Sequence, residues 1–161
     1  MRETYVYALD LSLNSTGIGI FTNDGRLIRL VTIDTKSEKE DKLKLSLIGK
    51  VFLMLLKNYT PSVVIIEQGF TLFNRSTQAI FKVHGLANYI FSEFEQIYYP
   101  ATTVKKVITG MGNASKEQVR NEILKKYPDI IFASLDESDA YAIAETYFIR
   151  QGIKNAKKNV S

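Results

Sequence analysis

The sequence predicts an α/β fold built on a mixed five-stranded sheet with helices on its faces. Residues 4–34 contain three short runs typical of antiparallel strands. From residue 37 onward, helical periodicity alternates with apolar runs, which is typical of parallel strands connected by helices. With 161 residues, the chain has the length of one domain. We expect that domain to span residues 1–152, followed by a basic tail, 153–161, that frays.

The first three strands follow from composition and from one turn. Residues 4–11 are rich in Tyr, Val and Leu, residues 15–22 alternate glycine with isoleucine, and residues 26–34 alternate again. Between the second and third runs, the Asn-Asp-Gly of residues 23–25 is a strong signal for a tight hairpin turn. The expected start of the fold is therefore a three-stranded antiparallel meander.

The remaining elements follow from helical spacing, proline and one cap. Apolar residues at helical spacing predict a long helix over residues 37–59, which Pro61 is expected to end. Ser115 followed by Gln118 is a capping-box pattern, which predicts a helix start. The other expected elements are a strand at 62–67, a loop at 68–75, a helix at 76–94, a strand at 96–99, and helices at 101–109, 115–127 and about 136–150.

Composition limits the possible chemistry. Because the chain has no cysteine, a bound metal would be held by oxygen or by the one histidine, His84, which favours Mg²⁺ or Mn²⁺ over zinc. No apolar run approaches the roughly 18 residues that a membrane span needs. The chain also enters a strand pattern directly, without the pattern of a signal peptide. We therefore expect a cytoplasmic protein with no membrane partner.

The net charge of +4 is unevenly distributed. Residues 101–126 hold six bases and two acids, residues 127–149 hold five acids and no base, and residues 150–161 hold four bases and no acid. Charge alone favours solvated helix faces. The alternative is a phosphate-binding surface beside a carboxylate metal site.

Four acids occupy positions that suggest such a site. Asp10 lies near the end of one apolar strand and Glu67 ends another, where an unpaired carboxylate faces a desolvation cost. Asp136 and Asp139 are three residues apart at a helix start and share a face, whereas Glu137 is expected to be solvated. Each acid alone could be a turn or cap residue. Together they would repel one another, and two divalent ions about 4 Å apart could compensate, activate a water and stabilise the leaving oxygen of a phosphodiester.

Four segments resemble the RuvC family of Holliday junction resolvases and stand in the family's order. They are Ala8-Leu9-Asp10-Leu11 with Thr16-Gly17; Ile66-Glu67-Gln68-Gly69-Phe70; Val104-Lys105-Lys106 with Gly110-Met111-Gly112 and Ser115-Lys116-Glu117-Gln118-Val119; and Asp136-Glu137-Ser138-Asp139-Ala140-Tyr141-Ala142-Ile143-Ala144. The resemblance implies an RNase H-like fold. It also implies a homodimer with two active sites that makes paired nicks across four-way DNA junctions.

The resemblance further implies a catalytic metal site without any small-molecule cofactor. The residues that match the family's metal-binding catalytic acids are Asp10, Glu67, Asp136 and Asp139. We expect them to hold two Mg²⁺ ions per active site, with Mn²⁺ able to substitute. Lys116 would lie near the charge that develops during cleavage.

Contacts to DNA follow from the same resemblance. Lys105 and Lys116 match basic residues that serve the DNA backbone and the active site. Phe70 matches an aromatic residue that contacts bases near the junction centre, and Phe73 is a weaker candidate for that role. The full set of expected DNA contacts is Phe70, Arg75, Lys105, Lys106, Lys116 and Arg120.

The resemblance places the dimer contact on the helix expected at 76–94. Its apolar stripe is more typical of core than of interface, so we expect only some of its residues to face a partner. The stripe consists of Ala79, Ile80, Val83, Ala87 and Ile90. His84 is expected at or beside this packing rather than at a metal.

One departure from the family pattern bears on substrate range. Many bacterial members follow the first aspartate with Pro-Gly, whereas this chain has Leu11-Ser12 and resembles resolvases of phages and mobile elements. Such members are expected to accept a wider range of branched DNA, including forks.

Three other functions remain possible from the sequence. One is an RNase H-like nuclease for RNA–DNA hybrids or replication forks. A second is one half of an actin-like ATPase, but that class of protein needs two such domains, which 161 residues do not provide. A non-catalytic junction-binding dimer would gain nothing from the four acids, because carboxylates repel phosphates.

Overall fold

The computed structural model of the chain describes residues 2–69 and 74–155, and for residues 74–76 the backbone alone. One sheet has the strand order β3-β2-β1-β4-β5, from β1 (Thr4–Asp10), β2 (Ser15–Thr22), β3 (Leu27–Asp34), β4 (Thr60–Gln68) and β5 (Gln96–Pro100). The helices are α1 (Asp41–Asn58), α2 (Asn74–Ile90), α3 (Ala101–Thr109), α4 (Lys116–Lys126) and α5 (Leu135–Arg150). The first three strands pair antiparallel, and β4 and β5 add to β1 in parallel. The predicted mixed sheet is confirmed.

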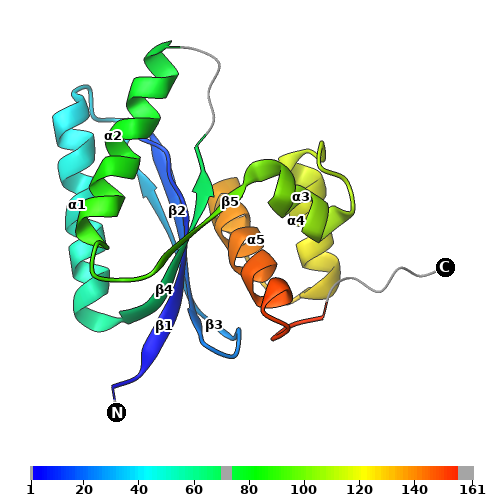
Figure 1. Cartoon of the computed structure of the whole chain (residues 1–161). Coiled ribbons are helices and arrows are strands. Elements are labelled where there is room, and N and C mark those ends of the chain that lie inside the picture. Colours follow the sequence, from blue (N-terminus) through cyan, green and yellow to red (C-terminus); the bar gives the residue numbers. More distant parts are fainter. Residues whose placement is uncertain (1, 70–73, 156–161) are drawn as a thin grey trace.

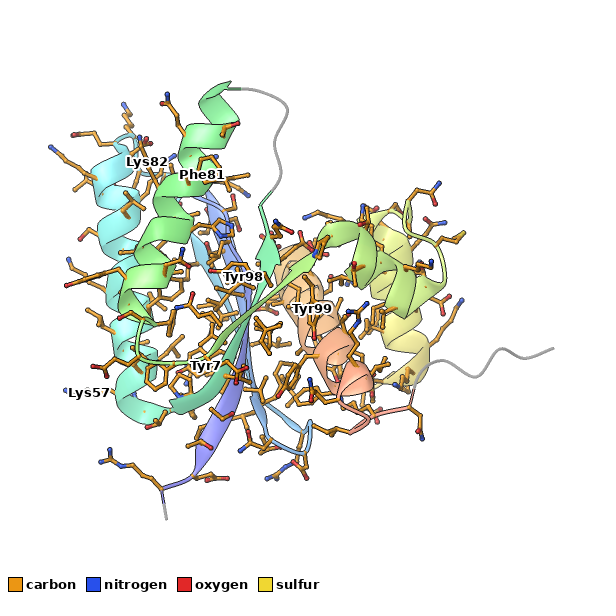
Figure 2. The ribbon with its side chains drawn as sticks, in the orientation of Figure 1. Tyr7, Lys57, Phe81, Lys82, Tyr98 and Tyr99 are labelled. Atoms are coloured by element: carbon orange, nitrogen blue, oxygen red, sulfur yellow. The ribbon has the colours of Figure 1, made fainter. Side chains whose placement is uncertain are left out.

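Helices cover both faces of this sheet (Figure 1): α1 and α2 lie on one face, and α3, α4 and α5 on the other. Successive side chains of a strand point to opposite faces, so each central strand contributes to two apolar cores. On β1, Val6 packs in the core beneath α5, whereas Tyr7 packs in the core beneath α1 and α2. Figure 2 shows the same alternation on β5, where Tyr98 lies toward α2 and Tyr99 toward α5. No helix in the described part of the chain is long and apolar enough to cross a membrane.

Three element boundaries differ from the sequence prediction. The first helix begins at Asp41, because residues 35–38 form a turn in which the Glu38 amide bonds to the Thr35 carbonyl. The helix expected at 76–94 spans Asn74–Ile90, and residues 91–94 form a turn after it. Pro61 lies inside β4 rather than before it, at the point where the pairing with β1 shifts register. Proline lacks the backbone N–H group that a regular strand pairing requires, so it is tolerated where the pairing is irregular.

The capping box predicted for the helix at 115–127 is present. The Ser115 hydroxyl accepts the Gln118 amide at 3.1 Å, and the Gln118 side chain accepts the Ser115 amide at 2.8 Å. This cap sets the start of α4 and therefore the position of its first residue, Lys116.

A buried charge cluster fastens the far end of α5. The Glu145 carboxylate, whose side chain is 1% exposed, accepts hydrogen bonds from Lys126 at 2.5 Å, Lys154 at 2.9 Å and the Tyr127 hydroxyl at 2.8 Å. Burial would raise the pKa of Glu145, but these partners outweigh it and hold the pKa below its usual value. Lys154 belongs to the segment expected to form the tail, and this contact ties it to α5.

Candidate active site

Three of the four acids meet where β1 ends and α5 begins. Asp10 is the last residue of β1 and pairs with Gly17 of β2. Asp136 and Asp139 lie in the first turns of α5. One carboxylate oxygen from each of Asp10, Asp136 and Asp139 lies within 4.8 Å of the other two. The strand end and the helix start therefore present one cluster of oxygen ligands.

Glu67 joins this cluster from the neighbouring strand. It is the penultimate residue of β4, which runs parallel to β1, so both strands end at the same edge of the sheet. Glu67 lines a hollow of about 100 Å³ together with Asp139, Lys105 and Lys116. The structure thus brings all four acids to one edge.

Burial and the charges of neighbouring carboxylates disfavour the charged forms of Asp10, Glu67 and Asp139. Burial raises the pKa of Asp10 well above its usual value, and the charges of Asp139 and Glu67 raise it further. Burial is also the main cause of the raised pKa values of Glu67 and Asp139. Without a compensating cation, this group of carboxylates therefore destabilises the fold when all of its members are ionised.

One ammonium offsets part of this negative charge. Lys116 Nζ lies 2.6 Å from Asp139 Oδ2, and only 12% of the Asp139 side chain is exposed. Burial alone would lower the pKa of Lys116, but the hydrogen bond and charge of Asp139 raise it, so this lysine stays protonated. A single ammonium does not neutralise four carboxylates, which leaves a net negative site.

The residues present suit a hard divalent cation. Each of the clustered groups is a carboxylate, and oxygen ligands of this kind hold Mg²⁺ and Mn²⁺. His84 is not a member of the cluster. Its Nε2 instead lies near Gly69, 3.0 Å from where a Cβ would stand, and burial lowers its pKa.

Side chains from β2 and β3 position the first turn of α5. The Ser15 hydroxyl donates to Asp136 Oδ2 at 2.5 Å. Ser134 caps the helix by accepting the Glu137 amide, so capping does not occupy the Asp136 carboxylate. The Thr32 hydroxyl lies 2.7 Å from Ser134 Oγ and donates to Glu137 Oε1 at 3.2 Å. Three hydroxyls therefore hold the turn that carries Asp136 and Asp139.

The expectation of a solvated Glu137 is wrong. Only 6% of this residue is exposed, and its carboxylate also accepts the Ala133 amide at 2.8 Å. Sequence patterns did not identify Ser15, Thr32 or Glu137 as part of the site. Ser15 and Asp136 are 121 positions apart, and no local pattern reports such a contact.

The predicted DNA contacts fall into three groups. Lys105 and Lys116 line the hollow that contains Glu67 and Asp139, and Lys106 is exposed on α3. Arg120 is partly buried on α4, and its Nε has no hydrogen-bond partner among the described residues. The last group is Phe70, Phe73 and the side chain of Arg75, which lie outside the described residues.

An RNase H-like sheet with carboxylates gathered at the ends of β1 and β4 defines a metal-dependent nuclease. The family model for crossover junction endodeoxyribonuclease RuvC matches residues 6–147. The chain belongs to this RuvC family, and it is accordingly an endodeoxyribonuclease.

Sequence relatives span nearly the whole chain. The RuvC of Orientia tsutsugamushi (strain Ikeda) is 34% identical over an alignment that covers 92% of this chain and 98% of the relative. The RuvC of Geobacter metallireducens is 30% identical and covers 96% of this chain and 98% of the relative. These relatives are bacterial and give no support to the expected phage origin.

A solved structure confirms the fold. The Thermus thermophilus RuvC in complex with a Holliday junction superposes with a TM-score of 0.79 at 22% identity, covering 95% of this chain and 99% of that one. The RNase H-like fold expected from the sequence is thereby confirmed.

Replacing Asp10 is expected to affect cleavage activity and protein stability in opposite directions. We expect Asp10→Asn to abolish cleavage yet raise the Tm of the metal-free protein by about 3 °C, the shift that roughly 1 kcal/mol produces in a domain of this size. Because the folded-state pKa of Asp10 is raised, its ionisation destabilises the fold at a pH above that pKa. The destabilisation shrinks as the pH falls through the raised pKa and is lost below the pKa of an aspartate in the unfolded chain. The gain in Tm should therefore shrink on acidification, as measured by thermal unfolding.

Asp129→Asn, at an exposed acid away from the cluster, is the matched control for this experiment. A lower Tm for the metal-free Asp10→Asn protein at neutral pH would contradict the repulsion described here.

The hydrogen bond from Ser15 makes a different prediction. Ser15→Ala leaves the Asp136 carboxylate free to rotate, so we expect the Mg²⁺ concentration for half-maximal cleavage to rise about tenfold. The rate at saturating Mg²⁺ should change far less, and Ser15→Thr should restore metal affinity. Ser46→Ala, at an exposed position on α1, is the control. Unchanged metal dependence of Ser15→Ala would show that the hydroxyl does not position the acid.

Proposed function

We propose that this chain resolves four-way DNA junctions by paired nicks, acting as a homodimer with two Mg²⁺ ions in each active site. The observation that carries the proposal is the gathering of four carboxylates and Lys116 at one edge of an RNase H-like sheet in a RuvC-family chain. Support for the substrate comes from the structural neighbour, the Thermus thermophilus RuvC in complex with a Holliday junction. Forks and other branched DNA are further proposed substrates.

Each residue of the cluster then has a defined task. Bound ions would supply an activated water and stabilise the charge of the leaving oxygen. The four acids hold those ions, with Asp136 oriented by Ser15. Lys116 keeps Asp139 in place through its 2.6 Å contact and adds positive charge where a phosphate would lie.

Affinity for DNA is proposed to come from α3 and α4. Lys105, Lys106, Lys116 and Arg120 all belong to these two helices, beside the acids. Phosphate contacts of this kind make binding salt-dependent. Phe70 is proposed to contact bases near the junction centre, and Arg75 is a further proposed DNA contact.

The test is cleavage of a labelled synthetic four-way junction with Mg²⁺, compared with linear duplex, a fork and an RNA–DNA hybrid. We expect paired symmetrical nicks in the junction that are lost in Asp139→Asn. Cutting of the hybrid alone would overturn junction resolution in favour of a ribonuclease. Tight junction binding without cutting would favour the non-catalytic dimer.

The proposed dimer surface is the outer face of α2. Phe81 and Tyr89 are 66% and 80% exposed, and Gly85 stands between them at helical spacing. A Cβ on Gly85 would meet nothing within 4 Å, so the glycine is not required by the fold of the single chain. Figure 2 labels Phe81 on α2. Two large aromatic side chains flanking a glycine let a second helix approach closely.

The stripe expected from the sequence divides between core and surface. Val83 and Ala87 are fully buried against the sheet, so they do not face a partner. Ala79, Ile80 and Ile90 are partly buried.

Charging the proposed dimer surface should separate the subunits. We expect Phe81→Asp to shift the protein from dimer to monomer in sedimentation and to abolish paired nicking, because a carboxylate would be buried at the interface. Ile131→Asp, at an 88% exposed residue before α5, is the control and should leave the dimer intact. A Phe81→Asp protein that remains dimeric would place the interface elsewhere.

A further inference from the structure

A second hollow lies beside the catalytic one. It has a volume of about 350 Å³ and is lined by Gln68, Gly69, Pro100, Ala101 and Thr102. Ala101 also lines the hollow that contains Glu67 and Lys116, so the two are neighbours at the same edge of the sheet. A nucleic-acid strand with a phosphate at the acids would pass directly beside the second hollow.

The lining of this hollow is mostly apolar, with one long polar side chain. Pro100 contributes a ring, Ala101 a methyl group and Gly69 its backbone. The side chain of Gln68 is exposed and makes no hydrogen bond within the described part of the chain, so its amide is free to bond a ligand. A side-chain amide both donates and accepts, which is the pattern needed to bond a base edge.

Strand alternation explains why two neighbouring residues serve two hollows. Glu67 and Gln68 are consecutive on β4, so their side chains leave opposite faces of the strand. Gln68 pairs with Pro100 of β5, which places it opposite the other side of the hollow. Gly69 then passes so close to α2 that a Cβ would lie 2.5 Å from Ile80 Cγ2. The backbone on both sides of Gln68 is therefore held in place.

We propose, on the basis of the proposed function, that this hollow receives a nucleobase next to the cleaved phosphate and that Gln68 reads its edge. The volume is within the range of small-molecule sites, roughly 300–1,000 Å³, and a flat base can stack on a proline ring and a methyl group. A phosphate suits it less, because none of the described residues that line it is basic. Gln68 is thus assigned as a residue that determines the sequence preference of cleavage.

The experiment measures cleavage rates on four-way junctions that carry each of the four bases at the positions flanking the nick. For the wild-type homodimer with Mg²⁺, we expect one base to be preferred by roughly tenfold or more, as for a two-point contact to a base edge. Gln68→Ala should lose that preference by slowing cleavage of the preferred junction to the rate of the others. Gln68→Glu, which can only accept while ionised, should shift the preference toward cytosine.

The controls distinguish failure of the Gln68 inference from failure of the proposed junction resolution. Gln151→Ala, at an exposed glutamine beyond α5, should keep the wild-type preference. A Gln68→Ala protein that retains the preference, or a wild-type protein that cuts all bases equally, would overturn the inference while leaving junction resolution intact. Equal slowing on every base would indicate a phosphate contact and also overturn it. A wild-type protein that cuts no junction would instead overturn the proposed function itself.

Discussion

The site depends on the contact between α5 and β2 at Gly17. A Cβ at this position would lie 2.1 Å from the carbonyl oxygen of Asp136, so only glycine allows α5 to pack this closely against the sheet. Gly17 is also the register partner of Asp10. The same close approach therefore fixes the position of α5 and brings Asp136 to the end of β1. Any lift of α5 at this point would separate the oxygen atoms that now lie within 4.8 Å of one another.

Packing holds together carboxylates that electrostatics would drive apart. Most of α5 is buried, and Ala140, Ala142 and Ala144 are fully enclosed. Small side chains let the helix lie close to the strands, while Glu145 and its lysines fasten the far end. The favourable free energy of this burial keeps Asp10 beside Asp139 even though the charge of Asp139 raises the pKa of Asp10. A cation at the site would remove the repulsion, which couples metal binding to the stability of the helix start.

Sequence reasoning reached most of the fold and the four acids, because both leave local signals. An acid at the end of an apolar strand, such as Asp10 or Glu67, stands out against its neighbours. Ser15 left no such signal, since its role comes from a partner 121 positions away. Glu137 was misjudged for the same reason: its burial depends on β3, and an acid in a first helical turn is usually solvated. The start of α1 was placed four residues early because helical periodicity does not report the turn at Glu38.

The α2 helix shows why periodicity cannot separate core from interface. Val83 and Phe81 are both large apolar side chains of one helix, and only the position of the sheet decides that Val83 is covered while Phe81 is exposed. The end of β4, the strand before α2, likewise contacts both sides of the sheet. At the end of β4, Glu67 faces the acids beneath α5, while the chain after Gln68 turns against α2. If α2 carries the partner subunit, then one strand end connects the cleavage chemistry to the dimer. A shift of α2 would move Gly69 and its neighbours together, because their contact leaves no room for independent adjustment.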